Sequence, residues 1–121
     1  MSLVVSAFWR NPATGETQEF THWSTGHYMA GVERARWELW GSEAVRQRGA
    51  KFLPQLAEAD LWVEPEDLEA FVAEVQTLLA DVDGLRAELG LGPNCLLPQY
   101  LGNFLRAAEY ARERGGGISI A

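Results

Sequence analysis

The sequence is poor in the residues that build disulfide frameworks, metal sites and membrane spans. It has one cysteine, Cys95, so an internal disulfide framework is excluded. His22 and His27 are the only histidines, and no third ligand at metal-site spacing accompanies them. We therefore expect no metal and no cofactor. No apolar run reaches the length of about 18 residues that a membrane-spanning helix needs.

Basic charge is also scarce. The chain has 10 Lys and Arg against 17 Asp and Glu, which gives a net charge of −7. Nucleic acids and anionic membrane surfaces are bound by basic faces, so we predict neither as a partner. Residues 1–10 lack the basic and then apolar order of a secretory leader, and a lone thiol is typical of a reducing compartment. The sequence therefore predicts a cytoplasmic protein.

What the sequence does contain is enough apolar material for one core. Hydrophobic residues make up 47% of 121 residues, a length that predicts a single domain over 1–121. Residues 3–9 are rich in β-branched and aromatic side chains, and residues 16–23 alternate polar with apolar. These two segments predict a hairpin, and residues 118–120 predict a third strand beside the first.

Helical patterns occupy most of the rest. The predicted helices span residues 24–40, 42–48, 65–89 and 98–114. The third has the clearest signal, because Pro65 opens it and an apolar stripe then recurs at helical spacing to Leu89. Residues 50–63 predict a connector with a short strand at 61–63. The sequence thus predicts an α+β fold, in which three to four helices pack on a three-stranded, mainly antiparallel sheet.

The negative charge is concentrated in one segment. Residues 58–88 hold ten acidic side chains and one basic side chain, a charge of −9 that leaves +2 for the rest of the chain. Two interpretations stay open: a solvated helix face with favourable first-turn electrostatics, or a docking surface for a basic protein. The candidate residues of that docking surface are Asp60, Glu64, Glu66 and Asp67.

A second candidate surface is aromatic. Trp23, His27, Tyr28 and Trp37 fall close together around the start of the predicted helix 24–40. They form a Trp-rich edge of the core, an exposed patch for a protein contact, or the lining of a small-ligand pocket between the sheet and the first helix. Strand edges at the hairpin and at the last strand also leave a homodimer open.

No residue set in the sequence meets the needs of a catalytic site. Cys95 has apolar neighbours, which is typical of an inert thiol rather than a nucleophile. The carboxylates of residues 64–69 follow the pattern of exposed first-turn residues, whereas an acid/base pair needs one desolvated member. We therefore predict a protein without enzymatic activity.

Short motifs stand on both sides of the connector. Tyr-Met-Ala-Gly-Val at 28–32 is followed by Arg36, and Asp60 is followed by Pro-Glu-Asp-Leu at 65–68. A helix rich in Leu and Ala then leads to a short strand at 117–120. In this order the chain resembles small bacterial immunity-type proteins of polymorphic toxin systems. The resemblance implies a protein-binding inhibitor. The aromatic residues leave an alternative open, a small-ligand-binding protein or a small enzyme with a pocket between the sheet and the first helix.

Overall fold

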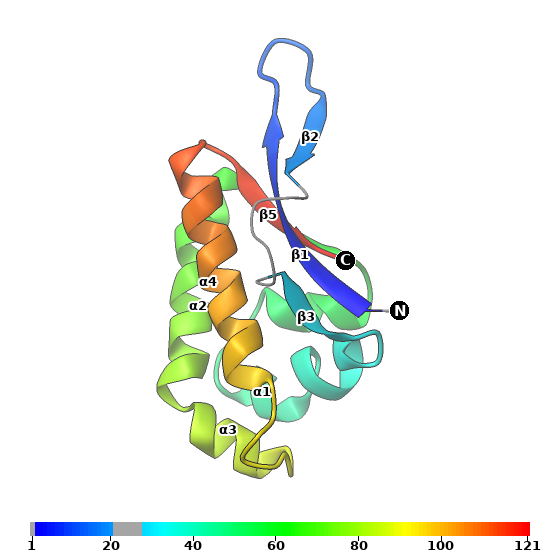
Figure 1. The fold of residues 1–121 in the computed structure, drawn as a ribbon, viewed down its shortest axis with the longest axis vertical. Helices are drawn as coiled ribbons and strands as arrows, with labels where there is room; N and C mark the ends of the chain where they lie inside the picture. The colour runs from blue at the N-terminus through cyan, green and yellow to red at the C-terminus, as the bar shows by residue number, and fades with distance from the viewer. Residues whose placement is uncertain (1, 21–27) are drawn as a thin grey trace.

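The computed structural model describes residues 2–20 and 28–121, which fold into an α+β structure as predicted (Figure 1). The strands are β1 (Ser2–Arg10), β2 (Thr17–Phe20), β3 (Met29–Val32), β4 (Leu61–Val63) and β5 (Gly117–Ile120). The α-helices are α1 (Glu43–Gln47), α2 (Leu68–Ala80), α3 (Val82–Glu88) and α4 (Leu97–Glu113). Three shorter helical segments are η1 (Arg36–Trp40), η2 (Leu53–Ala57) and η3 (Pro65–Asp67).

Strand β1 organises the sheet because both of its sides are paired. On one side β5 runs antiparallel to it, with Val5 opposite Ile120, and β4 lies beyond β5. On the other side β2 pairs with the second half of β1 and β3 with its first half, both antiparallel. The described sheet has five strands, so the prediction of three was wrong: it omitted β3 and left β4 in a connector outside the sheet.

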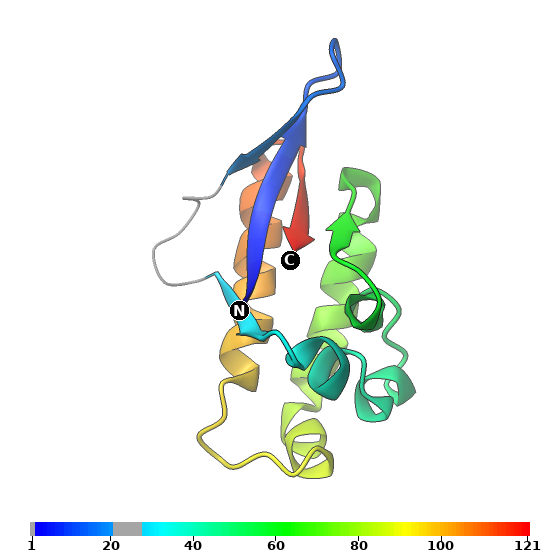
Figure 2. The same cartoon turned by 90° about the vertical axis from the view of Figure 1, so that its right-hand side faces the viewer.

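Helices α2 and α4 lie along one face of the sheet, and in Figure 2 the strands stand in front of these two helices. Side chains alternate along β1 as a strand requires. Leu3, Val5 and Ala7 belong to the core cluster that includes the helices, whereas Phe8 is buried outside that cluster. The second face of the sheet, on which Phe8 lies, is called the open face below.

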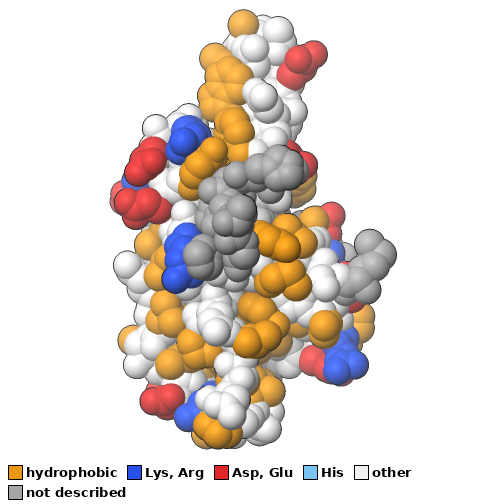
Figure 3. All heavy atoms as spheres, viewed as in Figure 1, with side chains coloured by type: hydrophobic (Ala, Val, Ile, Leu, Met, Phe, Trp, Pro, Cys, Tyr) orange, Lys and Arg blue, Asp and Glu red, His pale blue; other side chains and the backbone are white. Residues whose placement is uncertain are grey.

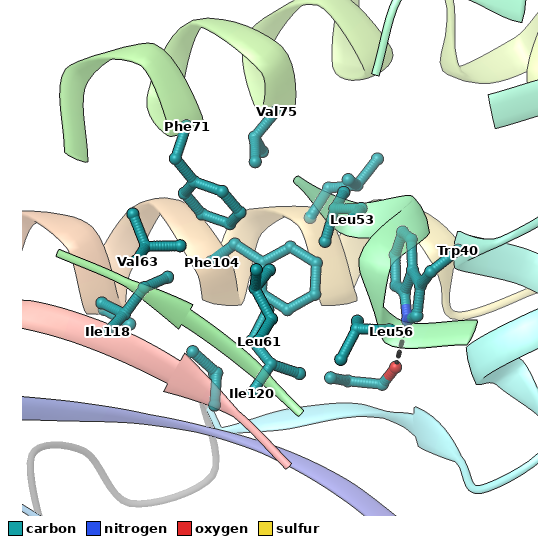
Figure 4. Close-up of a cluster of buried hydrophobic side chains, with 14 of the residues drawn as sticks. Trp40, Leu53, Leu56, Leu61, Val63, Phe71, Val75, Phe104, Ile118 and Ile120 are labelled. Carbon is teal, nitrogen blue, oxygen red and sulfur yellow. Dashed lines mark hydrogen bonds between the residues drawn. The ribbon is translucent and has the colours of Figure 1, made fainter. Parts of the chain in front are cut away.

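The core between sheet and helices is built on aromatic contacts (Figure 4). The rings of Phe71 in α2 and Phe104 in α4 meet edge-on, with centroids 6.0 Å apart. The ring of Trp40 lies 5.1 Å from that of Phe104, and its indole N–H donates a hydrogen bond of 2.9 Å to the carbonyl of Ala30. Because Trp40 is fully buried, this bond satisfies a donor that no water reaches and fixes η1 against β3.

Strand β3 lies where a helix was predicted. Part of the predicted span, residues 24–27, falls outside the described residues. In the rest, Met29–Val32 forms a strand, and helical backbone is confined to Arg36–Trp40. Gly31 has φ of 112°, a conformation that no helix contains and that side chains rarely adopt. The pairing of β3 with β1 therefore overrides the apolar spacing that suggested a helix.

The predicted helix 65–89 is divided. A 3-10 turn over Pro65–Asp67 leads into α2, and the backbone leaves helical geometry at Asp81 before α3 begins. A Cβ on Gly84 would lie 2.5 Å from the carboxylate of Asp81, so glycine leaves room for that side chain at the start of α3. Arg48, which follows α1, holds the break from outside through ion pairs of 3.1 Å to both Asp81 and Glu88.

Candidate functional site

The acidic segment 58–88 loses much of its free charge to internal contacts. Asp60 accepts a hydrogen bond of 2.5 Å from Nη2 of Arg36, whose side chain is only 14% exposed. The same guanidinium also donates to Glu33 and to the carbonyls of Leu56 and Ala59. The hydrogen bond to Asp60 is the largest cause that raises the pKa of Arg36 above its usual value. Asp60 therefore ties the loop before β4 to η1.

Glu64 lies at the other end of β4 and is paired with Arg10 of β1. The Arg10 guanidinium also lies over two aromatic rings, 4.6 Å from the centroid of Phe8 and 5.8 Å from that of Trp62. Two of the four predicted acidic site residues, Asp60 and Glu64, are thus separated by the length of β4. Each is paired with an arginine, and Asp60 shares its arginine with Glu33.

Further along the segment, most carboxylates also have internal partners. Glu74 accepts hydrogen bonds from the backbone N–H groups of residues 51–53. Asp81 and Glu88 pair with Arg48, and Asp83 pairs with Arg86. These contacts offset part of the repulsion among the carboxylates of a segment whose charge is −9.

Three adjacent carboxylates remain exposed and form no ion pair within the described part of the chain: Glu66, Asp67 and Glu69. They stand in η3 and the first turn of α2, where the helix dipole favours negative charge. We call them the acidic rim. Glu66 and Asp67 of the acidic rim were part of the predicted acidic surface, whereas Glu69 was not.

Next to the acidic rim in the chain is Trp62, the middle residue of β4. Its side chain is on the open face and 44% exposed, and its ring meets that of Phe8 edge-on at 5.1 Å. Phe8 in turn lies across Gly117, where a Cβ would come within 2.7 Å of the phenyl ring. The glycine in β5 therefore allows Phe8 to lie flat enough to support Trp62. We call Trp62, Phe8 and Arg10 the aromatic shelf.

Sequence reasoning did not select the aromatic shelf. A usable signal was present, because residues two apart in a strand share a face, which places Phe8 and Arg10 together. The third member, Trp62, joins them only through β5, which lies between β1 and β4. The sequence does not predict that β5 lies between β1 and β4, so it could not bring Trp62 to Phe8 and Arg10.

The predicted aromatic surface is only partly covered by the structure. Trp23 and His27 lie outside the described residues. Tyr28 and Trp37 are described and exposed, at 39% and 53%. Within the described part of the predicted helix 24–40, residues 29–32 form β3 and residues 36–40 form η1. The ligand pocket between the sheet and a first helix, two of whose four lining residues lie outside the described chain, stays a prediction.

The described residues contain no group of three or more His, Cys, Asp or Glu side chains placed to hold a metal ion. Among the helices of residues 2–20 and 28–121, none combines the length and apolar character needed to cross a bilayer. No protein-family model, no curated protein and no solved structure matches the chain.

Proposed function

We propose that this protein is a protein-binding module that docks a basic partner on the corner formed by β4 and η3. The observation that carries the proposal is the position of Trp62, which is nearly half exposed and shortly precedes in the chain three exposed carboxylates that form no ion pair within the described residues. An exposed tryptophan and an acidic rim together fit a partner that offers an apolar pocket edged by lysine or arginine.

Trp62 has the properties of an interface anchor. Tryptophan is enriched among the residues that contribute most to protein binding, because it buries a large area with little loss of side-chain freedom. Here the ring is already held by its edge-on contact with Phe8 and by the Arg10 guanidinium. Binding of a partner over Trp62 therefore costs little side-chain conformational entropy, because the ring is already ordered.

The acidic rim supplies the second requirement, which is selectivity. Its carboxylates are exposed, so each contributes modestly to affinity, but together they attract a basic surface and repel an acidic one. Asp60 and Glu64 contribute less to this field because each is paired with an arginine. Within residues 60–69, the carboxylates without an ion pair in the described chain therefore lie on η3 and the first turn of α2.

An immunity-type inhibitor of a basic toxin is the form of this function that the sequence resemblance implies. The two sequence motifs on which this resemblance rests contain Arg36 and Asp60, which pair with each other. This pair stabilises the loop that enters β4, and so it supports the docking corner without belonging to it.

The test is affinity capture from the natural source, followed by binding measurements with the purified partner. Four baits are compared: the unchanged protein, Trp62→Ala, the triple variant Glu66→Gln/Asp67→Asn/Glu69→Gln, and Trp37→Ala as the matched control. Trp37 is somewhat more exposed than Trp62, at 53% against 44%, and belongs to η1. Circular dichroism verifies that each bait is folded.

We expect one basic protein to be retained by the unchanged protein and by Trp37→Ala. Trp62→Ala should weaken its binding by about 2 kcal/mol or more, as for an anchor residue. The triple variant should slow association and reduce its dependence on salt. The proposal is wrong if the partner binds Trp62→Ala and the triple variant as tightly as the unchanged protein.

A further inference from the structure

A hollow with a volume of about 590 Å³ lies between β3 and the first half of α4, away from the docking corner. Met29, Leu96 and Pro98 provide apolar lining, and Tyr100, Asn103 and Arg106 provide polar groups. On the face of the molecule drawn in Figure 3, apolar side chains gather over β3 and the first turns of α4. This size and this mixture are typical of small-molecule sites.

Arg106 is the charged group of this hollow, and its charge is not neutralised by a carboxylate in the described chain. Within the described residues, six of the nine arginines pair with a carboxylate, whereas Arg106 makes a single hydrogen bond, from Nη1 to Oδ1 of Asn103 at 3.2 Å. A guanidinium carries five N–H donors, so most of its capacity is available to a ligand.

Two neighbouring residues place the guanidinium over the hollow. Asn103 is buried, and its Nδ2 donates to the carbonyl of Met29 at 2.9 Å, which leaves Oδ1 turned toward Arg106. Gly102 has no side chain, and a Cβ there would lie 3.3 Å from Nη1 of Arg106. The arginine therefore folds back along α4 over the glycine, toward the apolar part of the hollow.

We propose that this hollow binds a small organic carboxylate, which pairs with Arg106 and lays its apolar part against Met29, Leu96 and Pro98. A guanidinium binds a carboxylate through two parallel N–H donors, and one cation balances one such charge. The apolar wall favours an acid with a hydrocarbon body over inorganic phosphate, which has no group to place there. This site is separate from the proposed docking function and does not depend on it.

Benzoate and hexanoate are suitable probes, with benzamide as the uncharged analogue of the first. Each is titrated into ¹⁵N-labelled protein, and the backbone amide shifts of residues 96–106 are followed by NMR. The variants are Arg106→Gln and, as the matched control, Arg112→Gln. Arg112 is exposed on the same helix and also lacks a carboxylate partner in the described chain, but it does not line the hollow.

We expect at least one of the two acids to shift these amides saturably and benzamide to bind more weakly. Arg106→Gln should weaken binding by about tenfold or more, as for loss of a charge-assisted hydrogen bond, whereas Arg112→Gln should leave it unchanged. Gly102→Ala should also weaken it by moving the guanidinium. The proposal is overturned if neither acid binds, or if both arginine variants bind the acids equally well.

Discussion

Glu74 offers a sharp test of how the fold is held together, because one carboxylate serves three backbone groups. It lies in the middle of α2, and its Oε1 accepts hydrogen bonds from the N–H groups of Lys51 at 2.5 Å and Phe52 at 2.9 Å. Its Oε2 accepts from the N–H of Leu53 at 2.9 Å. These amides stand at the start of η2, where a helix has no partners of its own for them. Glu74 therefore caps η2 from another helix.

The expected cost of removing this cap follows from how exposed each amide is. The Lys51 amide is exposed, so water replaces its partner at little cost, whereas those of Phe52 and Leu53 are partly buried. Hydrogen bonds to a charged group contribute about 1.5–3 kcal/mol each, with incomplete additivity. We expect Glu74→Ala to lower the free energy of unfolding by about 2–4 kcal/mol. Glu74→Gln, which keeps one acceptor oxygen, should lower it by about half as much.

Urea denaturation followed by circular dichroism measures these differences. With an m-value of about 1.5 kcal/mol/M, Glu74→Ala should shift the midpoint down by about 1.3–2.7 M. The matched control is Gln76→Ala, an exposed position on the same helix, which should stay within about 0.5 kcal/mol of the unchanged protein. A loss in Glu74→Ala no larger than that in Gln76→Ala would show that η2 does not depend on this carboxylate.

Two further predictions concern the sheet and α4. Gly117→Ala would place a Cβ 2.1 Å from the carbonyl oxygen of Val63 and 2.7 Å from the ring of Phe8, so we expect a loss of about 3 kcal/mol or more in urea unfolding. Gly92→Ala meets open space and should be neutral, and equal losses in both would contradict this account. Burial raises the pKa of Tyr100 above its usual 10.0, with Cys95 as a smaller cause. The unfolded chain then ionises first as the pH rises through about 10, so the free energy of unfolding should fall there, and Tyr100→Phe should abolish that part of the fall.

The sequence predicted the elements that have strong local signals. The first strand, the helix over residues 42–48, the last helix and the strand after it are all present with bounds within a residue or two. The second hairpin strand, predicted over 16–23, is present as Thr17–Phe20, and residues 21–23 of that prediction lie outside the described residues. Their signals are local: the turn at 11–15, Ser42 as a cap that accepts a hydrogen bond from the Val45 amide, and the glycines that follow α4. The α+β class follows from these elements alone.

What the sequence did not predict depends on distant parts of the chain. The span around Met29–Val32 has an apolar spacing compatible with either helix or strand, and only its pairing with β1 decides between them. The helix 65–89 has one continuous apolar stripe. Gly84 indicates a bend or break late in it, but nothing in the spacing places that break at Asp81. That break depends on Arg48, which is 33 residues away in the chain.

The candidate site was limited in the same way. Counting charges located the acidic segment, but the count does not reveal which carboxylates meet a cation. Glu64 pairs with Arg10, which lies 54 residues away in the chain, and Asp60 pairs with Arg36, which lies 24 residues away. These pairs involve half of the predicted acidic site and leave Glu66 and Asp67, both in η3, without an ion pair in the described chain.

The central place of β5 has a consequence for how the chain folds during synthesis. Strand β4 pairs with β5 and reaches β1 only through it, and Val5 is opposite Ile120. A ribosome synthesises residues 2–63 well before residues 117–120. Strands β1 and β4 therefore cannot pair with β5 until translation has passed Ile120. Contacts this far apart along a chain form slowly. The edges of β1 and β4 that pair with β5 therefore stay unpaired until β5 has been synthesised, and unpaired strand edges are sites of aggregation.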